Sequence, residues 1–445
     1  MKKKILSIIL LLTTSLNAQK IYRLAGTGTS GHSGDGGLAL QALIGNTQGM
    51  TVDIYGYLLF IDQKHCVRRI DISNNIITTI TDTVPGYTGD GGQSDFARLY
   101  NPVGITTDAI GIIYITDKGN SRIRRINLGG IITTICGTGV YGFSGDGGPA
   151  SLADVNGISG IAVDKFGNII FADRFNQRIR KINTSGIIST IAGTGVAGFS
   201  GDGGLAINAK LDNPSGLALD TMGNIYFIDE FNYRMRKINI SSGIITTIAG
   251  NGVIGFGGDG GLGTSASISP RGIYCDKVGN VFLTEGSLRV RVIYPNGIID
   301  TYAGLGIPGN TGDGGPAYAC QLSGPNGITM DNDKNLYIGP LNGGNGSYTL
   351  RVICPSACYA EIDENSKEKE ITFYPNPCST SFKIKLNFPI KNGKVILHNV
   401  IGQKITERVI LDDLEIPVNS FTKGLYTLTI SENGSNLETR RLIIE

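Results

Sequence analysis

The sequence predicts an all-β protein, a six-bladed β-propeller over residues 19–358 followed by a small immunoglobulin-like β-sandwich over residues 371–445. Two observations predict the propeller. The sequence Gly-Asp-Gly-Gly occurs six times at intervals of 54 to 57 residues, and each copy is followed by the same succession of strand-like segments. A fixed period of this size with β-type segments in every unit is typical of propellers, and six units predict six blades.

One repeat shows how a blade is built. The strand-like segments of the third unit are residues 160–164, 169–173, 178–182 and 187–192. We expect four antiparallel strands, with the first and most apolar strand innermost because neighbouring blades cover it. Asp164 is expected to begin a tight turn. Asp173 is expected to face Arg178 or Arg180 and to clamp the loop between the second and third strands.

The two ends of the repeat region predict how the ring closes. The sixth unit runs through a third strand and then meets Pro355, so it lacks a fourth strand. Residues 20–26 match the fourth strand of other units, for example residues 188–193. We therefore predict that the N-terminal strand completes the sixth blade and removes the open sheet edges that an unclosed ring would expose.

The repeats resemble those of the NHL family. The motif Asp-x-x-Asn-x-Arg-[Ile/Met]-Arg-[Lys/Arg]-Ile is matched at residues 117–126, 173–182 and 229–238, and more weakly at 62–70 and 285–293. The sixth unit has Gly339 in place of the aspartate. The resemblance covers roughly residues 20 to 354 and implies a β-propeller. NHL propellers serve mostly as binding platforms, and a few relatives are lyases or hydrolases, so the resemblance implies binding more than catalysis.

The repeated aspartates are the first candidate site residues. They are Asp35, Asp90, Asp146, Asp202, Asp259 and Asp313. We predict a structural role, in which each carboxylate accepts hydrogen bonds from the following backbone amides in an Asx turn and lets the glycines take positive φ. Calcium is the alternative ligand, but a calcium site uses several oxygen ligands and each loop offers one carboxylate. We therefore predict no bound cofactor.

A column of side chains lies three residues before these aspartates. Its members are His32, Tyr87, Phe143, Phe199, Phe256 and Asn310. They belong to the Gly-Asp-Gly-Gly loops, which share one face of the propeller with the Asp-x-x-Asn-x-Arg loops and carry nearly all the residues beyond a minimal repeat. The column either stacks on a ligand or pins each glycine-rich loop onto the adjacent blade, and the second interpretation is favoured. His32 and Asn310 break the pattern, so the sector of blades one and six is the candidate for ligand chemistry.

The N-terminus and the charge exclude two classes of partner. Lysines at positions 2–4, an apolar run over residues 5–12 and a cleavage site between Ala18 and Gln19 predict a secretory signal peptide. No later segment is long and apolar enough to predict a transmembrane helix. Without the three N-terminal lysines the chain has 36 basic and 37 acidic residues, so no basic surface predicts nucleic-acid binding.

Cysteine and histidine usage gives little support for catalysis. Seven cysteines leave at least one thiol unpaired within the chain, and Cys354 and Cys358 are the one close pair. We predict a disulfide between these two in an oxidising compartment, with no metal there. The chain has three histidines, and none falls on a predicted inner strand. No catalytic residue is therefore assigned.

The tail has a different pattern. A charged linker over residues 359–370 precedes alternating short strands that predict a β-sandwich. Its opening residues Tyr374, Pro375, Asn376 and Pro377, together with a Gly-Leu-Tyr strand, resemble the C-terminal sorting domain of type IX secretion cargo. The resemblance implies export through a Gram-negative outer membrane by the type IX machinery. An accessory immunoglobulin-like binding module is the alternative.

These features predict a secreted or surface-located platform that binds a protein or a glycan on one propeller face. Two alternatives stay open at the level of sequence. One is a calcium-assisted lyase or hydrolase with its site in the central channel, and the other is a structural envelope protein without a discrete ligand.

Overall fold

A computed structural model describes residues 19–341, 347–355, 371–374, 376–386, 393–399, 402–410, 413–432 and 435–444. The contacts within the chain divide it into two units, Met1–Ala360 and Glu361–Glu445. The predicted signal peptide, the predicted linker and Cys358 lie outside the described residues. Among the residues described, no helix has the length and apolar character needed to cross a membrane.

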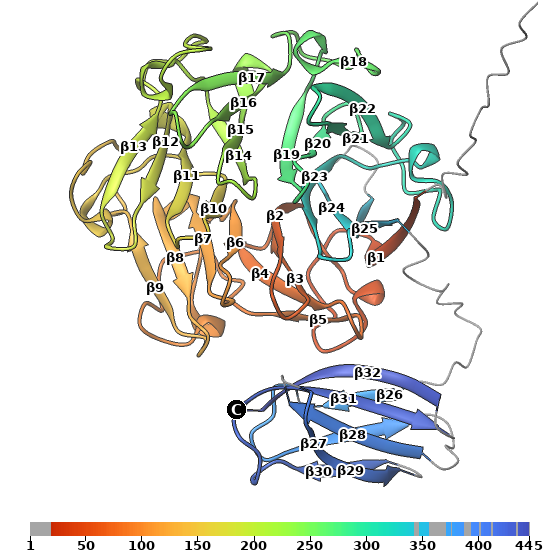
Figure 1. The fold of residues 1–445 in the computed structure, drawn as a ribbon. Coiled ribbons are helices and arrows are strands. Elements are labelled where there is room, and N and C mark those ends of the chain that lie inside the picture. The colour runs from red at the N-terminus through yellow and green to blue at the C-terminus, as the bar shows by residue number, and fades with distance from the viewer. Residues whose placement is uncertain are drawn as a thin grey trace, which may run out of the picture. The chain divides into compact units, whose positions relative to one another are not determined.

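The first unit is a propeller-like series of antiparallel sheets, in which consecutive strands of a repeat follow one another from the inside outward (Figure 1). The exceptions are β1 and β18, which each lie at the outer edge of a sheet formed by later strands. The first three sheets are β2 (Thr47–Val52), β3 (Tyr57–Asp62), β4 (Cys66–Asp71) and β5 (Ile76–Thr79); β6 (Ile105–Thr107), β7 (Ile113–Asp117), β8 (Arg122–Ile126) and β9 (Ile132–Cys136); and β10 (Ile161–Val163), β11 (Ile169–Asp173), β12 (Arg178–Ile182) and β13 (Ile188–Ala192).

The later sheets repeat this order with one addition. They are β14 (Pro214–Leu219), β15 (Ile225–Asp229), β16 (Arg234–Ile238) and β17 (Ile245–Ala249); β19 (Pro270–Cys275), β20 (Val281–Glu285), β21 (Arg289–Ile293) and β22 (Ile298–Ala303), extended by β18 (Gly261–Leu262); and β23 (Pro325–Met330), β24 (Leu336–Pro340), β25 (Tyr348–Cys354) and β1 (Lys20–Gly28). The short strand β18, which pairs with β22, is not anticipated from the sequence.

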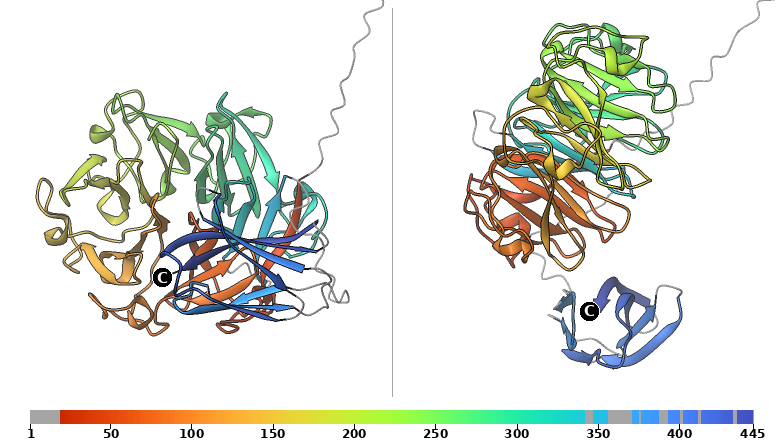
Figure 2. Two further views of the ribbon diagram at one scale, coloured as in Figure 1. Left: turned by 60° about the horizontal axis from the view of Figure 1, so that its bottom comes forward. Right: turned by 90° about the vertical axis from the view of Figure 1, so that its left-hand side faces the viewer.

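The innermost strands surround a common centre. Contacts join them in a closed cycle of β2, β6, β10, β14, β19 and β23, with β23 returning to β2. Each contains a glycine, or follows one directly, where its neighbour approaches, and a Cβ on Gly104 would lie 2.4 Å from the carbonyl oxygen of Ser159. The right-hand view of Figure 2 shows the sheets of this unit packed against one another, and buried clusters such as Ala172 with Leu217 and Phe227 fill the space between sheets.

The N-terminal strand pairs with the sheet that holds the end of the first unit. β1 runs antiparallel to β25, with Ile21 opposite Ile353 and Tyr22 opposite Val352. Ile21 is fully buried, in a cluster with Leu336 and Ile353. The predicted pairing of the N-terminal strand with the third strand of the sixth repeat is therefore observed.

Single-turn 3-10 helices occur at two places in the repeats. Those after the Gly-Asp-Gly-Gly loops are η1 (Ala39–Gln41), η2 (Ser94–Phe96), η4 (Ala150–Leu152), η6 (Ala206–Asn208), η8 (Gly263–Ser265) and η9 (Ala317–Ala319), and those after the second strand are η3 (Lys118–Asn120), η5 (Arg174–Asn176) and η7 (Glu230–Asn232). The loop packs tightly on its 3-10 turn: Gly145 has φ +88°, and a Cβ there would lie 2.6 Å from that of Ala153. Only glycine satisfies both conditions.

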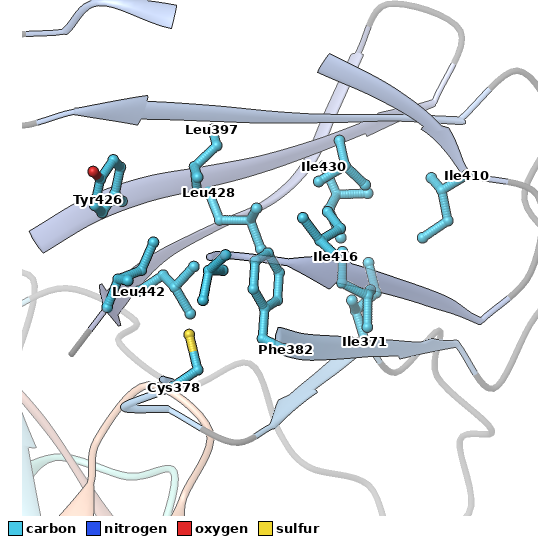
Figure 3. Packing of buried hydrophobic residues seen from close by; sticks show 14 of the residues in the cluster. Ile371, Cys378, Phe382, Leu397, Ile410, Ile416, Tyr426, Leu428, Ile430 and Leu442 are labelled. Carbon is cyan, nitrogen blue, oxygen red and sulfur yellow. The ribbon is translucent and has the colours of Figure 1, made fainter. Parts of the chain in front are cut away.

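The second unit consists of two sheets that share one core. Their strands are β26 (Ile371–Tyr374), β27 (Ser381–Leu386) and β30 (Leu414–Pro417) in one sheet, and β29 (Lys404–Ile410), β28 (Gly393–Asn399), β31 (Gly424–Glu432) and β32 (Ser435–Ile444) in the other. Figure 3 shows Phe382 of the first sheet and Leu428 of the second pointing into the same interior. The alternation of buried and exposed residues in β27 explains how a short strand supplies that core.

We expect the N-terminal strand to be necessary for the stability of the first unit. Removing residues 19–28 exposes the edge of β25, so the deletion variant should aggregate or become protease-sensitive. Ile21→Ala should lower the free energy of unfolding by about 2–4 kcal/mol, while Lys20→Ala, at an exposed position, should change it by less than about 0.5 kcal/mol. Chemical denaturation measures both, and a soluble, cooperatively folding deletion variant would contradict the closure.

Candidate functional site

A row of buried arginines ties the loops of the propeller face to their sheets. They occupy the third strand of each repeat and are almost completely buried: Arg68, Arg124, Arg180, Arg236, Arg291 and Arg351. Each forms an ion pair with the aspartate of the Gly-Asp-Gly-Gly loop in the same repeat, at N–O distances of 2.6 to 2.9 Å. All six repeated aspartates therefore have the same kind of partner, a buried arginine of the third strand.

The third repeat shows the full set of contacts. One terminal nitrogen of Arg180 donates to Asp146 at 2.7 Å and to the Ser144 carbonyl at 2.7 Å. The other donates to the Asp154 carbonyl at 3.1 Å and to Asp173 at 3.4 Å. A single guanidinium therefore joins the Gly-Asp-Gly-Gly loop to the loop that follows the second strand, and Arg180, not Arg178, is the partner of Asp173.

The predicted Asx turn is wrong as an explanation of the repeated aspartates, although their structural use is supported. The second oxygen of Asp146 accepts a hydrogen bond from Thr190 on the outer strand, at 2.6 Å. The aspartates in the turns between the first and second strands of each repeat instead accept hydrogen bonds from backbone amides. Asp164 accepts from the amides of Phe166 and Asn168, both at 2.9 Å, as expected for a turn starter.

The aromatic column stacks on a second arginine of the third strand. Arg122, Arg178, Arg234 and Arg289 lie 3.7 to 3.9 Å from the ring centroids of Tyr87, Phe143, Phe199 and Phe256. The four aromatic residues stay 40% to 43% exposed. Their cation–π contacts join each loop to the third strand of its own repeat. The contacts agree with the loop-pinning interpretation favoured from the sequence, except that the loop is held to its own blade and not to the adjacent one.

The two residues that break the column are placed differently. His32 has Nε2 3.3 Å from Thr79 Oγ1 and Nδ1 3.8 Å from the Cys66 sulfur. Burial, followed by the charge of Arg68, lowers the pKa of His32. Asn310 is half-buried in the sixth loop. A ligand site in this sector stays a prediction.

A cavity of about 360 Å³ lies where the innermost strands begin. The residue before each inner-strand glycine lines it; these residues are Gln48, Val103, Ser159, Ser215, Arg271 and Asn326. Arg174 and Glu230, from the loops after the second strands, complete the mouth and form an ion pair at 3.0 Å. The histidines His32 and His65 are not among the lining residues. The sequence contains a signal for this ring that the sequence analysis does not identify, because the residue before the repeated inner-strand glycine differs from repeat to repeat.

Phe175 and Phe231 directly follow the lining residues Arg174 and Glu230, and with Tyr100 of the preceding repeat they form a set of exposed aromatic residues that we call the aromatic rim. Tyr100, Phe175 and Phe231 are 48%, 50% and 57% exposed. Consecutive loops are connected, because the Gly119 amide donates to the Tyr100 carbonyl at 2.7 Å and Lys118 Nζ lies 5.5 Å from the Phe175 ring centroid. The aromatic rim lies on the face of the Gly-Asp-Gly-Gly loops, where we expected function. Phe175 follows the end of β11, whereas Phe166 lies in the turn before the start of β11 and so on the opposite face.

The remaining predicted residues belong to the two ends of the units. The Gln19 carbonyl accepts from the Ala317 amide at 2.8 Å, while Ala18 and Pro375 lie outside the described residues. In the tail motif, Tyr374 is exposed, and Asn376 accepts from the Ile443 amide of β32 and precedes Pro377. Cys354 is disulfide-bonded, and the pairing with Cys358 stays a prediction.

Comparison with known proteins identifies both units. A family model for the secretion system C-terminal sorting domain matches residues 372–445, and one for the Teneurin NHL domain matches residues 83–144, 142–199 and 196–256. The chain is therefore a propeller-type repeat protein with an export domain. More specifically, it contains repeats that match the NHL type and carries a type IX, or Por, sorting domain, which directs it to the cell surface or the outside of the cell.

Two kinds of relative support the fold. Mouse Teneurin-1 is 30% identical over 272 residues, and the alignment covers 50% of this chain and 10% of the teneurin. The Arabidopsis protein SUPPRESSOR OF QUENCHING 1 is 26% identical over 275 residues, covering 58% of this chain and 26% of that protein. The chain thus spans about a tenth of the teneurin and a quarter of the plant protein.

Two solved structures share the fold at low identity. A Bacteroides thetaiotaomicron protein of unknown function has a TM-score of 0.55 at 17% identity, with 76% of each chain covered. A Bacteroides ovatus protein described as an auxiliary nutrient binding protein has a TM-score of 0.54 at 16% identity, also with 76% of each chain covered.

We expect the buried arginine to be a major determinant of stability. Arg180→Met leaves Asp173 in a fully buried site without its countercharge, so the free energy of unfolding should fall by about 3–5 kcal/mol. Lys181→Met, on the same strand but half-exposed, is the matched control and should change it by about 0.5 kcal/mol. Chemical denaturation distinguishes the two, and equal effects would contradict the role of the clamp.

The same clamp predicts a pH dependence. Burial raises the pKa of Asp173 to about 6, so between roughly pH 4 and pH 6 the folded protein holds a proton that the unfolded chain releases. The raised pKa of Asp173 stabilises the folded protein fully at a pH below the pKa of Asp173 in the unfolded chain, and this stabilisation is lost as the pH rises through about 6. The difference in unfolding free energy between wild type and Asp173→Asn should therefore decrease from pH 4.5 to pH 7. A difference that increases over this range would contradict the raised pKa.

Proposed function

We propose that this protein is an exported binding platform, a closed six-bladed NHL propeller whose loop-bearing face captures a protein or glycan. The tail, which we interpret as an immunoglobulin-like sandwich, serves the type IX secretion machinery as the sorting signal. The division of labour follows from the two units, because one holds the cavity and the other matches the sorting-domain model.

The cavity with its exposed aromatic rim is the observation that carries this proposal. A volume of about 360 Å³ is in the range of ligand sites, and the neighbouring rings of Tyr100, Phe175 and Phe231 offer flat apolar surface on a rigid scaffold. Exposed aromatic residues grouped around a concavity are typical of interaction sites. The Bacteroides ovatus neighbour, described as nutrient-binding, agrees with this function without identifying a ligand.

No specific observation favours the alternatives. The repeated aspartates hold guanidinium groups at 2.6 to 2.9 Å, and a positive charge at that distance opposes calcium binding. The ionisable residues that line the cavity are Arg174, Glu230 and Arg271, and the one carboxylate among them is paired. This set supports binding better than acid–base catalysis. A structural envelope protein would give the rim no role.

The platform is tested by binding of the purified protein to glycan and peptide arrays, followed by titration of the best ligand. We expect saturable binding that Phe231→Ala weakens about 2- to 12-fold, because aromatic stacking contributes about 0.5–1.5 kcal/mol and tenfold corresponds to 1.4 kcal/mol. Phe166→Ala is the matched control, since Phe166 is 71% exposed on the opposite turn. Absence of saturable binding, or an equal effect of both variants, would contradict the proposal.

A further inference from the structure

The charges at the cavity mouth do not balance. Arg174 and Glu230 neutralise one another in their 3.0 Å ion pair. Arg271 also lines the cavity, and it has no hydrogen-bond or ion-pair partner among the residues that the structure describes. Lys118 stands next to the pair, stacked over Phe175. The mouth therefore presents two cations in excess.

Both excess cations are poorly compensated. Loss of hydration lowers the pKa of Arg271, and no carboxylate opposes this effect. Loss of hydration and the charge of Arg174 lower the pKa of Lys118, with Glu230 as the opposing charge. An anionic group beside either side chain would replace part of its lost hydration, and beside Lys118 it would also offset the charge of Arg174.

The cavity wall also contains neutral polar residues. Gln48, Asn326 and the serines Ser159 and Ser215 line it between the cationic positions, among apolar residues of the inner strands. Hydroxyl and amide side chains of this kind match the hydroxyl groups of a ligand. The adjacent aromatic rim matches a flat face of C–H groups.

We propose that the mouth binds a saccharide with several carboxylates, with Arg271 on one carboxylate in the cavity, Lys118 on another at the rim, the serines and amides on hydroxyls, and Phe175 or Phe231 against a sugar face. This inference rests on the proposed platform function and assigns its ligand class. The site takes the end of a uronate oligosaccharide, because a cavity of about 360 Å³ admits a small group but not a folded domain. An acidic peptide presents the charge without the ring hydroxyls, so the serine and amide side chains of the wall favour the saccharide.

The experiment uses matched ligands. Trimers of galacturonate and mannuronate are titrated into the purified full-length protein, each beside its methyl ester, which keeps the hydroxyls and removes the charge. We expect at least one free acid to bind about tenfold or more tightly than its ester, consistent with the strength of hydrogen bonds to charged groups. Added salt should weaken binding of the free acid and leave binding of the ester unchanged.

Three variants locate the carboxylate. Arg271→Gln and Lys118→Gln should each weaken binding of the free acid about tenfold and leave binding of the ester unchanged. Glu230→Gln removes the ion-pair partner of Arg174 and should strengthen binding of the free acid. Lys165→Gln, at an exposed cation on the opposite turn, should have no effect. Arg271 has no partner to lose, so its variant should keep the thermal stability of wild type.

The outcomes separate this inference from the function on which it rests. Equal binding of acid and ester, or binding unaffected by both Arg271→Gln and Lys118→Gln, overturns the carboxylate site while the platform stands. Binding of hexaglutamate peptide but of neither uronate replaces the saccharide with a peptide. Failure of every ligand on the arrays contradicts the platform itself.

Discussion

The ion pair between a buried arginine and a loop aspartate supports the whole loop-bearing face. In the third repeat, Arg180 reaches Asp146 in one loop, Asp173 in another and two backbone carbonyls, and it is 0% exposed. A charge at that depth is tolerated because carboxylates and carbonyls surround it. The loops contain many glycines and few apolar residues, so this ion pair acts together with the cation–π contact and the packing on the 3-10 turn to fix their positions. Because the same guanidinium binds Asp173, it also anchors the loop that carries Phe175.

The repeated architecture could be predicted from the sequence because its signals are local. The spacing of the Gly-Asp-Gly-Gly loops, the alternating segments and the match of residues 20–26 to an outer strand predict the sheets and the pairing of β1 with β25. Asp164 also behaves as the turn chemistry requires. These inferences need only neighbours along the chain or a repeat period.

The partners of the loop side chains could not be predicted in the same way. Asp146 looked like an Asx-turn residue, but its partner, Arg180, stands 34 residues further along the chain. The choice between Arg178 and Arg180 for Asp173 depends on which face of a strand is buried, and an alternating Arg-Ile-Arg sequence leaves that undecided. The cavity was missed because its residues come from every sheet and share only a position before a glycine.

The comparison of repeats with one another separates support from specificity. Arginine, aspartate and aromatic residues recur where the scaffold requires them, and each has a contact within its own repeat. The residue that follows the clamping acid differs instead: it is Lys118 in the second repeat, Arg174 in the third and Glu230 in the fourth. A scaffold with pseudo-symmetry offers the same backbone at each position, so only such differences can give the mouth a direction. Since Lys118, Arg174 and Glu230 occupy successive repeats, a ligand bound there would meet an asymmetric charge distribution within a nearly symmetric frame, and its orientation would follow from the side chains and not from the fold.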